Sequence, residues 1–316
     1  MLGRGVSRRL RDVGPEWFLG DVRPILLQAD AVLANLESPI TSGGERWRRS
    51  WKMFHFRAHP AAVRILECAN VRFVCLANNH MLDFGPSGLC DTMRTLDAAG
   101  VRYAGAGRNS EEAAAPAVLK LPGLTVGLIA ATDNMRAFAA GPDRPGTNFI
   151  EFEAQQPALD WITRSVTALR QAGARLIVFS AHWGPNMRRT PSRAFRRFAH
   201  AAIERGVDVL HGHSAHVFQG IELHKSGVIL YDTGNFIDDY WKFPFRRTVW
   251  SFVFLLDVEG DRPQRLQLVP VHIHASPLGL ARGPISEAIN ARMTSLCADL
   301  GTPVVKTSKG LEIPLA

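Results

Sequence analysis

The sequence is poor in features that define several large classes of protein. Its 316 residues include four cysteines without CxxC spacing, so we expect reduced thiols packed as small hydrophobic side chains rather than a disulfide framework. The sequence contains no apolar run of about eighteen residues, so we expect no membrane span within it. No apolar segment follows Met1 either, which argues against a secretory leader at this position.

Lysine is also scarce, and arginine supplies most of the positive charge. The 37 basic residues outnumber the 29 acidic ones, which gives a net charge of +8 and an isoelectric point near 9.8. This balance favours an anionic partner: nucleic acid, a phosphate ester, an acidic polymer or a membrane surface. Hydrophobic residues make up 46% of the chain, a composition that excludes a disordered or collagen-like protein.

Short apolar runs alternate with amphipathic stretches, a pattern that predicts an α/β fold. Strands are expected at 31–37, 71–79, 124–131, 175–182, 207–213, 228–233, 251–258 and 265–273. Helices are expected near 60–69, 86–99, 157–172, 191–205 and 285–300. We predict one layered domain over residues 1–275, with a C-terminal helical extension, 276–316, packed on it.

Polar donor residues follow directly on several predicted strands. In a buried-sheet α/β fold the carboxyl ends of the strands meet at one crevice, and neutral imidazole is a common metal ligand. A carboxylate, a carboxamide and several imidazoles together predict a di-metal hydrolytic centre. The residues in question are Glu37, Asn78, Asn79, His80, His182, His211, His213 and, three residues further on, His216.

A single histidine at a strand end has a simpler explanation, because many such residues are hydrogen-bonded parts of the core. The metal interpretation depends on the combination of these residues, since five strand ends each carry a potential metal ligand that has no packing advantage there. We expect surface or supporting roles for the histidines that lack this context: His55, His59, His200, His224, His272 and His274.

The segment LANNHMLDFGPSGLCDTMRTLDAAGVRYAGAG resembles the signature of the poly-gamma-glutamate capsule-synthesis, or CapA-type, family. The pieces ANLESPIT, FRAHP, AHWG, HGHSAHVFQGIE and LYDTGNF occur in the family's order, and the resemblance covers roughly residues 1–240. It implies a calcineurin-like metallophosphatase fold: two facing mixed β-sheets flanked by helices in a four-layer αββα sandwich, with a di-metal centre at the strand ends.

The resemblance also implies roles for individual residues. Glu37 would bridge two metal ions, His80 would protonate the leaving oxygen as general acid, and Asp83 would orient His80 through its second ring nitrogen. The implied cofactors are divalent ions of Mn, Fe or Zn, two of them if the family's N-terminal aspartate exists upstream. The implied metal ligands are Glu37, Asn79, His182, His213 and His216, with His211 as an alternative to one of the last two.

The opening of the chain departs from the family pattern. Members begin with a strand that ends in Gly-Asp, two residues before a Leu-Gly-Arg-like sequence, whereas this chain opens at Met1-Leu2-Gly3-Arg4. We expect the first strand and its metal-binding aspartate to lie upstream, and Asp21 to occupy a later, non-ligand position. The alternative is a protein without that ligand. As written the chain is expected to be cytoplasmic; with an upstream segment it would be extracytoplasmic and membrane-anchored.

Arginines follow three of the proposed strand ends, and we expect them to line the rim of the crevice, where guanidinium groups suit phosphate and carboxylate alike. The clusters are Arg46, Arg48 and Arg49, then Arg188, Arg189 and Arg193, then Arg246 and Arg247. The predicted substrate-binding residues are Asn78, Arg188, Arg189, Asn235, Arg246 and Arg247.

Three functions fit these patterns. The first is a metal-dependent hydrolase acting on a phosphate ester or related anionic substrate, linked by the resemblance to poly-gamma-glutamate or capsule synthesis. The second is a non-catalytic accessory subunit that binds an acidic polymer such as polyglutamate. The third is a metal-dependent nuclease, which we rank lowest because no aromatic-interleaved platform is visible, so nucleic acid is the least favoured partner.

Overall fold

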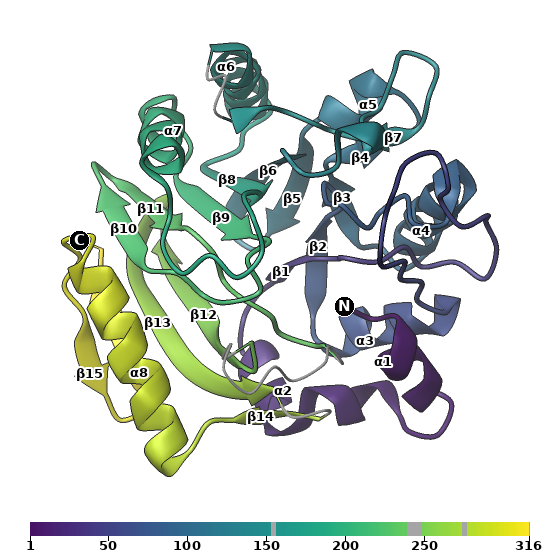
Figure 1. Ribbon diagram of the computed structural model, residues 1–316. Coiled ribbons are helices and arrows are strands. Elements are labelled where there is room, and N and C mark those ends of the chain that lie inside the picture. The colour runs from purple at the N-terminus through teal and green to yellow at the C-terminus, as the bar shows by residue number, and fades with distance from the viewer. Residues whose placement is uncertain (153–155, 239–247, 274–276, 316) are drawn as a thin grey trace.

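Two layers of β-structure face each other, and helices cover their outer sides (Figure 1). The computed structural model describes residues 1–152, 156–238, 248–273 and 277–315. None of the helices within these ranges is both long enough and apolar enough to cross a membrane.

The first layer is a six-stranded mixed sheet in which four neighbouring strands run parallel. Every residue of the strand β8 (Leu176–His182) is buried, as its unbroken apolar run predicts. The helices α6 (Gln156–Gln171) and α7 (Arg193–Glu204) cover its outer face, where Phe198 and Trp161 pack edge-on against Phe179. In spatial order the strands are β10 (Ile221–His224), β11 (Gly227–Leu230), β9 (Val209–His213), β8 (Leu176–His182), β6 (Leu124–Thr132) and β5 (Ala117–Leu121).

The second layer consists of two separate sheets. One is parallel, in the order β1 (Val32–Asn35), β2 (Val71–Cys75) and β3 (Arg102–Ala104). The other is antiparallel, in the order β12 (Trp250–Glu259), β13 (Arg262–Ile273), β16 (Gly310–Pro314) and β15 (Val305–Thr307), with β14 (Leu278–Leu280) also paired to β13. A cavity of about 1340 Å³ lies between β1 and β12 and reaches the first layer.

The remaining elements pack around these layers. Helix α4 (Gly85–Ala98) has Pro86 in its first turn. It is followed by Gly100, whose positive φ of 67° suits a residue without a side chain. The other helices are α1 (Arg4–Arg9), α2 (Arg23–Leu26), α3 (Val63–Cys68), α4 (Gly85–Ala98), α5 (Ser110–Ala114) and α8 (Gly283–Ala298). Short 3-10 helices occur at Pro15–Val22, Pro60–Ala62 and Arg136–Phe138, and β4 (Ala106–Gly107) pairs with β7 (Gly146–Thr147).

The structure confirms the predicted α/β class and the sheets flanked by helices. All eight expected strands are present within a few residues of their expected bounds, and so are the five expected helices. The difference lies in the second layer, which is divided by the cavity instead of forming one sheet. The short strands β3, β4, β5, β7, β10 and β14–β16 were not expected. The boundary between residues 275 and 276 stays a prediction.

We predict that Phe198→Ala lowers the free energy of unfolding by about 3–5 kcal/mol, because it leaves a cavity among buried rings. Phe198 is 1% exposed and contacts Phe152, Phe179 and Trp183. Urea denaturation measures the change. The neighbouring exposed Arg197→Ala is the matched control and should cost less than about 0.5 kcal/mol; equal effects of the two changes would contradict the packing we describe.

Candidate functional site

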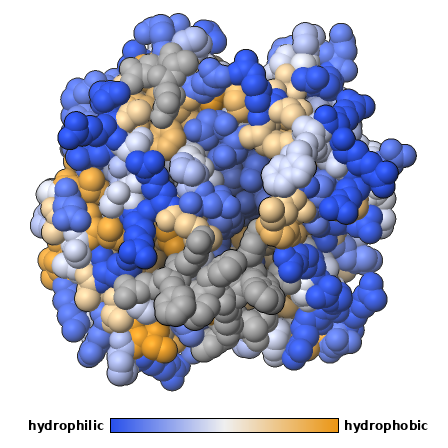
Figure 2. All heavy atoms as spheres, viewed as in Figure 1, coloured by the Kyte–Doolittle hydropathy of each residue, from blue (hydrophilic) through white to orange (hydrophobic). Residues whose placement is uncertain are grey.

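Parallel pairing brings the predicted donor residues together at one edge of the sheets. In the first layer, His182 of β8 and His213 of β9 are register partners at the last residue of each strand. In the second layer, Glu37 and Asn79 lie just beyond β1 and β2. Figure 2 shows a hollow with a hydrophilic floor on this side of the molecule.

Glu37 lies at the centre of the site. Its Oε1 is 3.9 Å from the Nε2 atoms of both His182 and His216. The Oδ1 of Asn79 lies 3.1 Å from His182 Nε2, so the amide oxygen and the carboxylate approach the same ring nitrogen. The structure therefore brings these four predicted ligands into one cluster.

The charge on Glu37 is stabilised by its neighbours. Burial alone would raise the pKa of this carboxyl, but the imidazoles of His182 and His216 hold it at about 2. Burial lowers the pKa of His182 to about 4, so its imidazole is neutral at pH 7. Burial also opposes protonation of His216, but Glu37 and a hydrogen bond from His216 Nδ1 to Asn235 Oδ1 raise its pKa. The site thus combines a buried carboxylate with a neutral imidazole, both of which are potential metal ligands.

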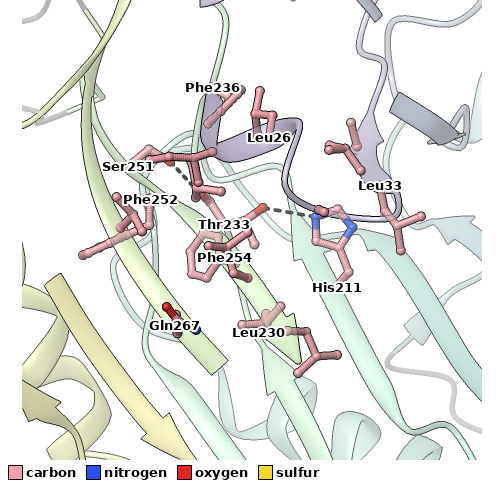
Figure 3. A pocket seen from close by; sticks show the side chains of 18 of the residues that line it. Leu26, Leu33, His211, Leu230, Thr233, Phe236, Ser251, Phe252, Phe254 and Gln267 are labelled. Carbon is pink, nitrogen blue, oxygen red and sulfur yellow. Dashed lines mark hydrogen bonds between the residues drawn. The ribbon is translucent and has the colours of Figure 1, made fainter. Parts of the chain in front are cut away.

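His213 lies behind His182 and is held by two contacts. Its Nδ1 is 2.9 Å from His182 Nδ1, and its Nε2 is 3.0 Å from the hydroxyl of Ser180. His211 lies two residues earlier on the same strand, between the hydroxyls of Ser180 and Thr233 at 3.2 and 3.3 Å; Figure 3 shows the contact with Thr233. Both His211 and His213 line the cavity, as do Glu37 and His216.

His80 and Asp83 form a separate hydrogen-bonded pair next to the cluster. Their Nδ1 and Oδ2 atoms are 2.7 Å apart, and the same carboxylate oxygen accepts a 2.7 Å hydrogen bond from the backbone N–H of Phe56. Burial raises the pKa of Asp83 to about 7, and burial and nearby Lys52 hold the pKa of His80 well below its usual range. This geometry confirms the expected contact; the catalytic role of the pair stays a prediction.

Lys52 was not expected in the site. Its ammonium group lies 3.3 Å from Asp83 Oδ1 and donates a 2.6 Å hydrogen bond to the carbonyl oxygen of Asn79. Its side chain is 8% exposed, and burial lowers its pKa although the charge of Asp83 opposes this effect. The only signal in the sequence was the scarcity of lysine, because Lys52 stands in an arginine-rich segment that looked like plain surface.

Three more residues that the sequence analysis missed shape the loops of the site. Asp133 accepts a hydrogen bond from Gly184 N, and Asn134 lies within 3.4 Å of the carbonyl oxygens of His182 and Gly184. Buried Asp232 accepts from the backbone N–H of Ala215 and Gly234, and burial raises its pKa to about 7. Asp133 and Asn134 follow a predicted strand, so the strand-end rule that selected the histidines could have found them.

Two predicted substrate-binding residues support neighbouring parts of the site. Buried Asn78 donates to Asn35 Oδ1 and to the carbonyl oxygen of Leu36, which ties the ends of β1 and β2 together. The Oδ1 of Asn235 lies 2.9 Å from His216 Nδ1 and orients that ring. Their part in substrate binding stays a prediction.

The arginines that the structure describes lie at the surface, as expected for a rim. Arg188 and Arg189 are exposed in the loop after β8, and this loop joins the His216 turn through a hydrogen bond from Met187 N to Ala215 O. The exposed side chains also include Arg46, Arg48, Arg49 and Arg193. The predicted residues Arg246 and Arg247 lie outside the described ranges.

The donor set fits a divalent ion in its chemistry. Glu37 Oε1 is buried and, within the described part of the chain, accepts no hydrogen bond. A cation beside it would satisfy this oxygen. As they stand, however, no three His, Cys, Asp or Glu side chains of the described residues are arranged around one ion. His182 and His213 point their Nδ1 atoms at each other, while the Nε2 of His182 faces Glu37.

Comparison with known proteins places the chain in a family. Residues 1–240 match the family described as bacterial capsule synthesis protein PGA_cap. The chain belongs to this family. A probable polyglutamine synthesis accessory protein of Mycobacterium tuberculosis is 36% identical over 301 residues, covering 92% of this chain and 78% of the relative. The capsule biosynthesis protein CapA of Bacillus anthracis is 29% identical over 279 residues, covering 86% of this chain and 65% of CapA.

Two of the similar solved structures are distant from this PGA_cap chain. The NAD nucleotidase of Haemophilus influenzae has a TM-score of 0.35 at 14% identity and covers 71% of this chain and 36% of its own. The sulfate thiohydrolase SoxB of Thermus thermophilus has a TM-score of 0.42 at 11% identity, and the match covers 76% of this chain and 39% of SoxB. This chain spans less than half the length of either, and similarity this low carries no inference about activity.

We predict that His211→Gln makes the stability of the metal-free protein less dependent on pH. Burial lowers the folded pKa of His211 to about 4, below the usual value near 6.5. The contribution of His211 to the free energy of unfolding is therefore complete above about pH 6.5 and is lost as the pH falls towards 4. Urea unfolding is measured from pH 4 to 7.5 with a chelator present. In His211→Gln the free energy of unfolding should change less steeply with pH, by the equivalent of about one proton. Exposed His59→Gln is the control; an unchanged slope in His211→Gln would refute the effect.

We predict that Lys52→Met raises the pKa of Asp83 further, because it removes the cation beside a carboxyl that stays buried. The ¹³C chemical shift of the Asp83 carboxyl, followed by NMR against pH, measures this change. Lys52→Arg keeps the charge and should titrate near the wild type, as should Lys120→Met at an exposed position. If Lys52→Met titrates like these controls, Lys52 does not act on Asp83.

Proposed function

We propose that this chain is a metal-dependent hydrolase of the metallophosphatase type, acting on a phosphate ester or related anionic substrate during capsule or poly-gamma-glutamate synthesis. The observation that carries the proposal is the buried Glu37 carboxylate, whose Oε1 lies 3.9 Å from two imidazoles. The separate His80–Asp83 pair supports it, since hydrolysis needs a proton donor beside the anion-binding groups.

The proposed metal ligands are Glu37, Asn79, His182, His213 and His216. Divalent ions held there would activate water and neutralise charge on the phosphoryl oxygens. Asn235 keeps one ring nitrogen of His216 occupied, which leaves Nε2 directed at Glu37. Metal analysis of the purified protein would identify the ion as Mn, Fe or Zn and count whether one or two bind.

His80 is the proposed proton donor to the leaving oxygen. Its Nδ1 is bonded to Asp83, so the proton would move through Nε2. Burial and Lys52 keep the pKa of the free imidazole low, and the negative charge of a bound phosphate would raise it. The exposed Arg188 and Arg189 would attract an anionic substrate to the rim.

A second candidate is a non-catalytic accessory subunit that binds an acidic polymer such as polyglutamate through the arginine rim. Two observations favour it: a relative carries the name accessory protein, and no three His, Cys, Asp or Glu side chains of the described residues are arranged around one ion. A metal-dependent nuclease remains the third candidate, and it would show steep salt dependence of binding. We also propose that the hydrolase acts in the cytoplasm.

We predict that His80→Ala lowers turnover by about 100-fold or more while leaving metal content nearly unchanged, because it removes the proton donor but no ligand. A panel of phosphomonoesters and phosphodiesters, with metal quantification of the same samples, measures both quantities. Exposed His59→Ala is the matched control and should behave like the wild type.

A second variant, Glu37→Gln, should lose bound metal, because it removes the charge at the centre of the cluster. If His80→Ala keeps full turnover, the proposed mechanism is wrong. If the wild-type protein binds less than one equivalent of metal yet binds polyglutamate, the accessory function replaces the hydrolase.

A further inference from the structure

Apolar side chains gather at the tip of one loop, residues 42–57, which we call the exposed loop. Trp51 is 82% exposed, Met53 60% and Phe54 47%. They are three of the six large hydrophobic side chains exposed in the described part of the chain, and the other three are scattered: Leu27, Ile285 and Val305. Scattered apolar side chains are normal on a protein surface, whereas a group of them in one place marks an interaction site.

The exposed loop is also strongly basic. It contains five Lys or Arg residues and one Glu, and five minus one gives a net charge of +4. Arg46, Arg48 and Arg49 are exposed and precede the apolar tip. Cations beside exposed aromatic and apolar side chains suit the headgroup region of a bilayer that contains anionic lipid, where charge and apolar surface lie within a few ångströms of each other.

The base of the exposed loop is closed by the backbone. Ile40 and Ala58 form an isolated bridge, in which Thr41 N donates to Ala58 O over 2.9 Å and Ala58 N donates to Pro39 O over 2.8 Å. In Figure 1 the chain between β1 and α3 runs outward beside α4. Adjoining ends and inward packing are typical of an Ω-loop, a kind of loop that often carries function.

Inward-facing side chains hold the exposed loop against the candidate site. Trp47 is buried, and its backbone N–H donates to the carbonyl oxygen of Asp83. The ammonium group of Lys52 lies 3.3 Å from the Asp83 carboxylate, and the ring centroids of Phe56 and His80 are 4.4 Å apart. Because these anchors fix the shape of the loop, its outward side chains are presented in advance, which lowers the entropy lost on binding.

The apolar tip favours a bilayer over an acidic polymer as the partner. The carboxylates of a polymer in water would pair with the arginines but would leave Trp51 and Met53 in contact with water. A bilayer takes up both kinds of side chain, because apolar surface is removed from water while each cation is attracted to the anionic leaflet. Tryptophan is also enriched at membrane–water interfaces.

We propose that the exposed loop docks the protein on the surface of an anionic bilayer. Its apolar side chains enter the headgroup region while its arginines meet lipid phosphates. The candidate site then lies close to the bilayer, since Lys52 and Phe56 of the same loop contact the His80–Asp83 pair. The docking residues are Arg46, Arg48, Arg49, Trp51, Met53 and Phe54. The inference rests on exposure and charge and is independent of the proposed function.

The test is sedimentation of the full chain with vesicles of phosphatidylcholine, either alone or mixed with about 30% phosphatidylglycerol. Binding to the anionic vesicles should be at least about tenfold stronger than to the neutral ones. It should weaken as salt rises from about 0.1 to 1 M, because the Debye length shortens. Absence of binding to the anionic vesicles overturns the proposal and leaves the proposed hydrolase untouched, because turnover is no part of this measurement.

An apolar double variant tests the tip of the loop. Trp51→Ser combined with Met53→Ser should bind the anionic vesicles about tenfold or more weakly than the wild type, because less apolar surface enters the bilayer. The matched control is Ile285→Ser combined with Val305→Ser, which replaces two exposed apolar side chains on α8 and β15. The replaced side chains are exposed, so unfolding midpoints should stay near that of the wild type. Equal binding by the two double variants contradicts docking through the tip.

A charge variant tests the arginines. Arg46→Gln combined with Arg48→Gln should weaken binding to the anionic vesicles by about tenfold or more. Arg164→Gln combined with Arg197→Gln removes the same charge from exposed positions on α6 and α7 and should bind like the wild type. If soluble polyglutamate binds instead of vesicles, and the first variant alone loses it, the loop binds an acidic polymer and the proposal is wrong.

Trp51 also reports its own position. On binding anionic vesicles, the tryptophan emission of the wild type should shift to shorter wavelength and be quenched by brominated lipid. Trp51→Phe keeps an apolar ring, so it should still sediment with the vesicles but lose both spectral changes. Vesicle-bound protein in which Trp51 is not quenched would show that another surface makes the contact.

Discussion

The buried charge of Glu37 is the constraint on which the rest of the site depends. A carboxylate removed from water is costly unless opposite charge or hydrogen bonds replace the lost hydration. Here three chain segments surround the carboxylate: Asn35 donates a hydrogen bond to Oε2, His216 has a raised pKa that favours its positive form near Oε1, and the neutral ring of His182 faces the same oxygen. The ends of β1 and β8 and the turn after β9 must therefore meet at one point, and the two facing layers hold them there.

A shell of buried polar side chains keeps these segments in place. Asn78 ties β1 to β2, Asp133 holds the turn after β8, and Asp232 holds the turn that carries His216. Lys52 connects the loop after β1 to Asp83 and to the backbone of Asn79. These contacts involve backbone groups of the same loops that carry the candidate ligands, so they fix loop shape as well as charge. A functional site of this kind needs such support, because small displacements of the reacting groups reduce catalysis strongly.

The two layers differ in how completely they are built. The first layer is continuous, with a fully buried central strand and rings packed beneath α6 and α7. The second is divided where β1 and β12 face the cavity, at the same end as Met1 and the histidine cluster. The candidate site thus lies where a continuous layer meets a divided one, and the geometry of Glu37 depends on the edge strand β1.

The sequence by itself determined the class of fold and the main strands and helices, because strand and helix periodicity are local properties. The family resemblance carried by its motifs implied the ligand set Glu37, Asn79, His182, His213 and His216 and the His80–Asp83 contact. Only the tertiary structure revealed Lys52, the support from Asp133 and Asp232, and the division of the second layer. These depend on contacts between segments far apart in the chain, and a lone lysine or aspartate looks the same in sequence whether it faces water or a buried carboxylate. Parallel pairing of the strands decided which donors meet.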